Sequence, residues 1–251
     1  MEFKASEELR NRQLVLLDML KEVDALLTRN DIQYSLCAGT LLGAVRHNGF
    51  IPWDDDIDIM VDRENYAKII KLFENFDADS KFTLNRVLWI YRIQQRENSA
   101  NDLSVPTIDI FVFDHCPMNA FIRKYKLFLV KMLQGMLKTE KDNKKHSLIH
   151  RVCLGGTRLL GKLFTYNAKF RWYDKATRIG NKKDCEYLGS YFSPYKNLPL
   201  QYSKTLMQKI ERHAFEDGMM PITAEYDNYL SAQYGNYMQL PKEEDRISTH
   251  M

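Results

Sequence analysis

The amino-acid sequence predicts a mixed α/β (α+β) fold, a small mixed sheet flanked by helices with a basic helical segment inserted. Three observations predict it. Helical and strand-like apolar patterns alternate along residues 1–115. The 251-residue chain is 45% hydrophobic and 12% aromatic, which supports a sizeable core and excludes a disordered protein. The middle of the chain is far more basic than its two ends.

The alternating elements can be assigned in order. Apolar residues recur at three- and four-residue spacing over residues 6–30, which predicts a long amphipathic helix with acids in its first turn. The elements expected next are strands at 31–37 and 56–61, a helix at 64–76, a strand at 88–94, a polar turn at 95–102 and a strand at 107–113.

The rest of the chain divides by composition. We expect one domain, 1–251, with a core at 1–120, a basic helical segment at 121–183 and a C-terminal segment at 184–251. In the C-terminal segment, helical spacing predicts helices at 204–215 and 224–234.

The formal net charge of +3 conceals two opposite charges. Residues 121–183 hold 17 Lys and Arg against three acids, a charge of +14, and the remainder carries −11. Basic amphipathic helices suit an anionic membrane surface. An ordinary pair of surface helices with solvated Lys and Arg is the alternative. Nucleic acid is not expected as a partner, because no binding motif accompanies the charge.

Cysteine usage and hydropathy favour a cytoplasmic protein, or one bound peripherally at the inner face of the cell membrane. The four cysteines form no CxxC pair, as in proteins that keep reduced thiols. The N-terminal residues lack the apolar stretch of a signal peptide. No apolar run approaches the roughly 20 residues that span a bilayer.

Acidic residues interrupt two apolar, strand-like segments. Asp56 and Asp58 stand two apart in DDDIDI, so a strand would place both on one face, and Asp109 lies in TIDIF. Crowded carboxylates are tolerated chiefly around a divalent cation, and oxygen ligands suit Mg²⁺ or Mn²⁺. The three residues therefore predict a metal site for phosphoryl or nucleotidyl transfer. A polar strand end is the alternative, while an EF-hand calcium loop lacks its central Gly and distant Glu.

Residues upstream of the acids suggest a phosphate site. Gly39 and Thr40 follow a strand, where a small turn lets backbone amides approach a phosphate. Arg46 offers a guanidinium for phosphate oxygens. Trp53 is either a packing wedge or a platform for a base.

These segments resemble the LicD family, a branch of the nucleotidyltransferase-fold superfamily that also includes the fukutin-type proteins. The similarity is carried by AGTLLGAVRHNGFIPWDDDIDIMVDRENY, by WIYRIQ and TIDIFVFD, and by FEDGMMPITAEYDNYLSAQYGNYMQLP near the C-terminus. Arg92 stands where many relatives carry Lys, and YGNYM replaces the more usual YGDYM. Glu216 remains in its family position.

The resemblance implies transfer of a phospho-alcohol, most simply phosphocholine, from a CDP-activated donor to a hydroxyl of a cell-surface glycan or its lipid-linked precursor. It implies Asp56, Asp58 and Asp109 as ligands of Mg²⁺, with Asp109 the candidate for activating the acceptor hydroxyl. The resemblance assigns further substrate-binding residues, which are Gly39, Thr40, Arg46, Trp53, Asp54, Asp55, Arg92 and Glu216.

Two other functions fit the sequence. One is an NTP-using nucleotidyltransferase that modifies a small molecule or a protein, and it would release pyrophosphate rather than CMP. The other is a non-catalytic protein that binds the membrane surface. The presence of all three motif acids argues against the second.

Overall fold

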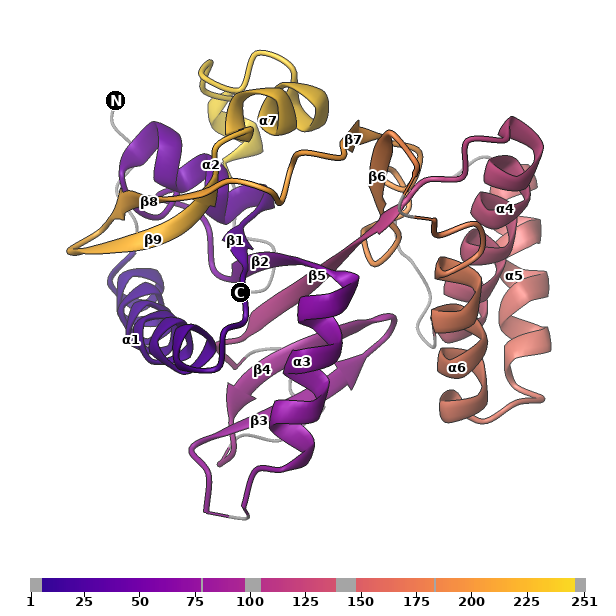
Figure 1. The fold of residues 1–251 in the computed structure, drawn as a ribbon, viewed down its shortest axis with the longest axis horizontal. Helices are drawn as coiled ribbons and strands as arrows, with labels where there is room; N and C mark the ends of the chain where they lie inside the picture. The colour runs from indigo at the N-terminus through magenta and orange to yellow at the C-terminus, as the bar shows by residue number, and fades with distance from the viewer. Residues whose placement is uncertain (1–5, 78, 98–104, 139–147, 183, 247–251) are drawn as a thin grey trace.

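The computed structural model describes residues 6–77, 79–97, 105–138, 148–182 and 184–246, with the backbone alone at 148–154 (Figure 1). A mixed sheet forms the centre, a two-stranded hairpin and four helices surround it, and three further helices stand to one side. The predicted mixed α/β class is confirmed.

The central sheet has seven strands, in the order β1-β2-β5-β4-β3, with β6 on the far end of β5 and β7 beside β6. Its strands are β1 (Ser35–Leu36), β2 (Ile57–Asp62), β3 (Phe82–Val87), β4 (Ile90–Gln95), β5 (Ile108–His115), β6 (Tyr187–Ser190) and β7 (Tyr202–Ser203). Strands β2 and β5 run parallel, and β4 runs antiparallel to β5. Ile57, Ile59 and Ile108 are fully buried, as the alternation of apolar and acidic residues predicted.

The N-terminal helix α1 (Glu7–Arg29) begins at Ser6, whose hydroxyl accepts a hydrogen bond from the Leu9 amide. Its apolar stripe is buried in the core, as the spacing predicted. Helix α2 (Ala38–His47) follows β1 directly, and α3 (Arg63–Glu74) is capped by Asp62 at the end of β2. These helices fix the chain on either side of the acidic segment 54–58.

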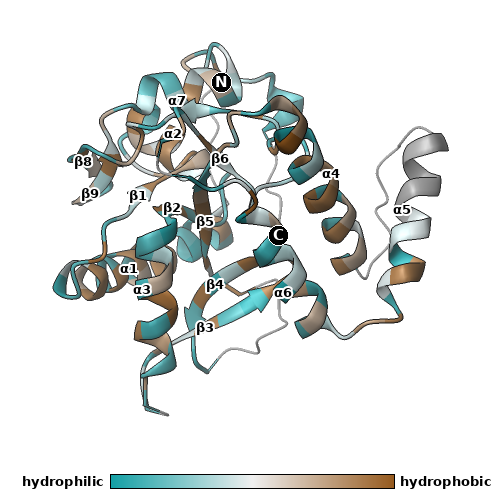
Figure 2. Ribbon diagram, turned by 45° about the vertical axis from the view of Figure 1, so that its right-hand side comes forward, coloured by the Kyte–Doolittle hydropathy of each residue, from teal (hydrophilic) through white to brown (hydrophobic). Residues whose placement is uncertain are grey.

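The basic segment folds as a helical lobe. It consists of α4 (Ala120–Leu137), α5 (Leu148–Gly161) and α6 (Tyr166–Thr177), which stand beside the sheet in both views (Figures 1 and 2). Two glycines allow α4 and α5 to pack closely. A Cβ on Gly161 would lie 2.5 Å from the Met136 carbonyl oxygen, and one on Gly135 would collide with Thr157.

The prediction of a helix at 204–215 is wrong. The chain forms β8 (Ile210–Phe215), which pairs antiparallel with β9 (Gly218–Thr223). Pairing with β9 overrides the local helical spacing, because β9 packs on β1, where the Thr223 amide donates to Ser35 Oγ at 2.8 Å. The second predicted helix is confirmed as α7 (Tyr226–Tyr234), and a short 3₁₀ turn (Glu243–Asp245) follows it.

Other differences are smaller. The strand predicted at 31–37 shortens to Ser35–Leu36, and β3, β6 and β7 were not predicted. Of the polar turn predicted at 95–102, residues 98–102 lie outside the described residues. Within the described part of the chain, no helix combines the length and the apolarity needed to cross a membrane.

Candidate functional site

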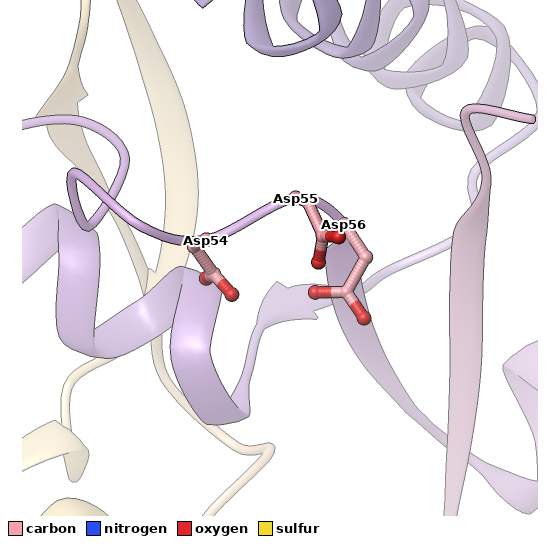
Figure 3. A group of neighbouring side chains, drawn as sticks. All are labelled: Asp54, Asp55 and Asp56. Atoms are coloured by element: carbon pink, nitrogen blue, oxygen red, sulfur yellow. The ribbon is translucent and has the colours of Figure 1, made fainter. Parts of the chain in front are cut away.

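A loop of three consecutive aspartates leads into β2. Figure 3 shows Asp54, Asp55 and Asp56 with their carboxylates gathered on the same side of this loop, and one oxygen from each lies within 4.8 Å of the others. Asp55 is fully buried, while Asp54 and Asp56 are half-buried. Such a group of oxygens is a suitable set of donors for a hard divalent cation.

The first helix holds this loop through its backbone carbonyls. Gln13 Nε2 donates to the Asp54 carbonyl at 2.9 Å and to the Ile51 carbonyl at 3.3 Å. Arg12 Nε donates to the Asp55 carbonyl at 2.6 Å. Sequence analysis missed both residues, although Gln13 gave a signal, because it is a polar residue inside the buried apolar stripe of α1.

Three further side chains from three neighbouring strands lie in one row. Asp58 on β2 is in register with Asp109 on β5, and Asp109 is in register with Arg92 on β4. Arg92 grips both carboxylate oxygens of Asp109, with Nε 2.8 Å from Oδ1 and Nη2 2.9 Å from Oδ2. The side chains of Arg92 and Asp109 are 11% and 6% exposed, so this is a largely desolvated pair.

The acids outnumber the cations near Asp58. Burial raises the pKa of Asp58 well above its usual value, and the charges of Asp56, Asp109 and Asp54 raise it further, while Arg92 acts in the opposite direction. The four carboxylates therefore share one electrostatic neighbourhood, and an added cation would relieve their repulsion. The group includes the predicted Asp56, Asp58 and Asp109, and it adds Asp54. By its donor chemistry it fits Mg²⁺ or Mn²⁺.

The start of α2 faces the same loop. Gly39 and Thr40 lie in the first turn of α2 rather than in a separate loop. A Cβ on Gly39 would approach Asp54 Oδ2 to 2.8 Å, so a larger residue here would displace the Asp54 carboxylate. Thr40 Oγ1 accepts a hydrogen bond of 2.8 Å from the Asp58 amide. Ala38 adopts φ 46°, an unusual left-handed conformation that is stored strain beside the acids.

The other predicted residues, Arg46, Trp53 and Glu216, make contacts between the N-terminal and C-terminal parts of the chain. Arg46 Nη1 donates to the Tyr237 carbonyl at 2.8 Å, and the guanidinium carbon of Arg246 lies 5.7 Å from the centre of the Trp53 ring. Glu216 accepts two hydrogen bonds from Arg10, at 2.6 and 3.1 Å. It also accepts a third from the Phe50 amide, at 3.1 Å. These contacts tie the β8–β9 turn to α1 and to the loop after α2.

Tyr234 was missed by the sequence analysis. Partial burial of the phenol and the charges of Asp58 and Asp54 raise its pKa, although the residue as a whole is 40% exposed, so the C-terminal helix α7 brings an aromatic hydroxyl towards the acids. The signal was present, because Tyr234 begins the YGNYM segment.

Comparison with known proteins shows which family the matched part of the chain resembles. Residues 31–124 match the family described as LicD/FKTN/FKRP, nucleotidyltransferase domain. Over these residues the chain is similar to the LicD-family domain. That matched range includes the aspartate loop, Asp109 and Arg92.

Among curated proteins, the chain is 28% identical to the lipopolysaccharide cholinephosphotransferase LicD of Haemophilus influenzae, over 97% of this chain and 96% of that protein. It is 42% identical to an uncharacterised protein of Rickettsia prowazekii, over 26% of this chain and 25% of that protein. A similar uncharacterised protein of Rickettsia typhi is 43% identical over 26% of this chain and 21% of its own length.

Proposed function

We propose that this LicD-family chain transfers phosphocholine, or a related phospho-alcohol, from a CDP-activated donor to a hydroxyl of a cell-surface glycan such as lipopolysaccharide. The observation that carries the proposal is the alignment with a lipopolysaccharide cholinephosphotransferase over nearly the full length of both chains. The gathered acids of the matched domain support it, because transfer from a diphosphate needs a cation-binding site.

The acids at the start of β2 and β5 are the proposed metal ligands. Asp56, Asp58 and Asp109 would hold Mg²⁺ or Mn²⁺, with Asp54 beside them. When bound, a divalent cation neutralises the charge of the donor diphosphate and of the departing CMP. Arg92 keeps the Asp109 carboxylate oriented by gripping both of its oxygens.

The proposed reaction is a single substitution at phosphorus. The oxygen of the acceptor hydroxyl forms a bond to the phosphorus that carries the alcohol, and the bond from that phosphorus to the oxygen of CMP breaks. The hydroxyl proton passes to a carboxylate of the site and then to water, and Asp109 is the candidate predicted from sequence. The chain's own contribution is therefore to place carboxylates on rigid strands, where they can bind and orient.

The first experiment measures CMP release from CDP-choline in the presence of Mg²⁺ and lipopolysaccharide. We expect Asp56→Asn and Asp58→Asn each to lower turnover roughly a thousandfold, the equivalent of about 4 kcal/mol. Asp18→Asn is the matched control, since Asp18 is exposed on α1. Circular dichroism establishes that each variant is folded. Unchanged CMP release in Asp58→Asn would overturn the proposal.

The same assay separates the alternatives. Pyrophosphate release from an NTP would favour an NTP-using nucleotidyltransferase, and absence of any turnover or metal binding would favour a non-catalytic protein. The donor alcohol is identified by thermal unfolding with CDP-choline, CDP-ribitol and CDP-glycerol in Mg²⁺. The donor that binds the native state most tightly raises the melting temperature most.

A further inference from the structure

The outer face of α4 carries large apolar side chains in solvent. Phe121 is 79% exposed, Tyr125 51% and Phe128 63%. They stand at positions i, i+4 and i+7, which share one side of a helix. We call these three residues the aromatic ridge. Large rings at this exposure are unusual on a water-facing surface and indicate a partner surface.

The opposite face of α4 is the one that packs inside the protein. Val130, Leu133 and Leu137 are buried there. Lys126 is also buried, and its ammonium lies 3.7 Å from the centre of the Tyr191 ring. The core therefore already occupies one side of the helix, and the aromatic ridge is not needed to hold α4 in place. Figure 2 shows hydrophobic, brown turns along α4 at the side of the sheet.

The charge around the ridge selects the kind of partner. Helix α4 holds four basic residues and no acidic one, and Lys124 is exposed between Phe121 and Tyr125. The lobe-forming segment as a whole carries +14. A second apolar group lies in the same lobe at the end of α5, where Leu159 is 69% and Leu163 74% exposed, with exposed Lys162 between them.

We propose that the helical lobe docks on an anionic lipid bilayer, with the aromatic ridge of α4 entering the interface and the exposed Lys124 and Lys162 contacting the headgroups. A second copy of this chain would bring a second +14 segment against the first, which repels. A nucleic acid would gain from the lysines and little from exposed Phe and Leu. An anionic bilayer satisfies the aromatic rings and the charge together.

This inference deepens the proposed function, because it places the transferase where a lipid-linked glycan acceptor resides. Vesicle binding tests the inference without any measurement of catalysis. The aspartate loop and the ridge lie on different elements, so a variant in one leaves the other intact.

The test is co-sedimentation of the full chain with vesicles. We expect binding to vesicles of equal parts phosphatidylglycerol and phosphatidylcholine, weak binding to pure phosphatidylcholine, and loss of binding at high salt. Phe121→Ser and Phe128→Ser should each weaken the partition coefficient roughly tenfold. Lys124→Glu should weaken it by at least about fivefold.

Matched controls come from exposed apolar residues elsewhere. Leu14 on α1 is 44% exposed and Met219 on β9 is 54% exposed, so Leu14→Ser and Met219→Ser should bind vesicles as the parent does. Thermal unfolding shows whether each variant is folded.

Three results would overturn the proposal. The first is equal binding by parent and ridge variants, and the second is equal binding to both vesicle compositions. The third is a dimer, seen by light scattering, that the ridge substitutions dissociate, because the ridge would then cover a second copy. Loss of CMP release with intact vesicle binding would contradict the proposed function alone.

Discussion

The two ends of strand β5 each hold a buried aspartate gripped by an arginine, yet their surroundings differ. At the beginning of β5, Asp109 is paired with Arg92, and three more carboxylates act on the same neighbourhood. At its end, Asp114 is paired with Arg63 in an equally close bidentate contact. The Asp109–Arg92 pair therefore lies among excess negative charge, whereas the charges and hydrogen-bonding groups of the Asp114–Arg63 pair all have partners.

The satisfied pair joins the core to the helical lobe. Asp114 is 1% exposed and also accepts a hydrogen bond of 2.7 Å from Asn181 Nδ2. Arg63 donates onwards to Asp174 at 2.8 Å and to Thr177 at 3.0 Å, both on or beside α6. The same two residue types therefore form a stabilising pair where every partner is present, and where negative charge is left in excess they form the end of the strand at which we propose that a cation binds.

Disrupting the Asp114–Arg63 pair at the end of β5 should have the largest effect on stability. Asp114→Asn removes the buried one of the two carboxylates that pair with the Arg63 guanidinium and leaves only Asp174, and we expect a loss of about 3 kcal/mol in the free energy of unfolding. Urea denaturation measures it. Asp217→Asn is the control, because Asp217 forms an ion pair with Lys21 at the surface with its side chain 68% exposed, and such pairs contribute little. Equal small losses in both variants would contradict the comparison.

The pH dependence of stability that Lys126 causes tests the electrostatics at the same end of β5. Burial lowers the pKa of Lys126 from 10.5 to about 8, against the favourable charge of Asp114. Between about pH 8 and 10 the unfolded chain keeps a proton on Lys126 that the folded chain has released, so the contribution of Lys126 to stability rises with pH by up to about 1.4 kcal/mol per unit. The buried Cys37 thiol, whose pKa is raised, acts in the opposite sense in this range and is the same in parent and variant. Above pH 10 the buried tyrosines, whose pKa values are raised, act in the opposite sense.

The measurement is urea denaturation at several pH values for the parent and for Lys126→Met. Methionine keeps the volume of the buried stem without its charge, so the rise between pH 8 and 10 should disappear. A parallel rise in both proteins would assign the effect to other groups. Lys124→Met, at an exposed site on the same helix, is the matched control.

Removing the charge of Asp58 near the beginning of β5 should change the free energy of unfolding least. The change should be stabilising, opposite in sign to that of Asp114→Asn. The raised pKa of Asp58 means that its ionised form is disfavoured in the folded chain at neutral pH. Asp58→Asn should therefore raise the free energy of unfolding by about 1 kcal/mol while removing turnover. If the acids bind Mg²⁺ as proposed, Mg²⁺ should raise the melting temperature of the parent, and Asp58→Asn should diminish that rise. Destabilisation together with unchanged stabilisation by Mg²⁺ would contradict this prediction.

Much of the site could be predicted from sequence because its residues are close together along the chain. The acids of 54–58 and the second acid-bearing strand were visible as charges inside apolar alternation, and β2 and β5 lie side by side with Asp58 and Asp109 in register. The register itself was not predictable, since pairing between strands about 50 residues apart depends on the whole sheet.

The wrong helix at 204–215 and the overlooked residues Arg12 and Gln13 have a common cause, which is that contacts distant in the sequence decide them. The helical spacing of 204–215 is a local signal, and strand pairing between β8 and β9 outweighs it. Gln13 and Arg12 hold the aspartate loop through backbone carbonyls more than 38 residues away, and a carbonyl acceptor carries no sequence signature. Composition placed apolar and basic residues together in the segment 121–183, but the fold decided which of them face outwards, because Phe121, Tyr125 and Phe128 are exposed whereas Leu133 is buried.

By itself, the sequence determined the mixed α/β class, the acidic core and basic middle segment, and the carboxylates proposed as the site, because these depend on periodicity and composition. Only the tertiary structure decided which of the two arginine-paired aspartates of β5 stands among further carboxylates. Asp109 and Asp114 look alike in IDIFVFD, and their difference lies in what β2, β4 and α6 bring to each end of one strand. Charge acts through space, so partners distant in the chain set the role of each residue.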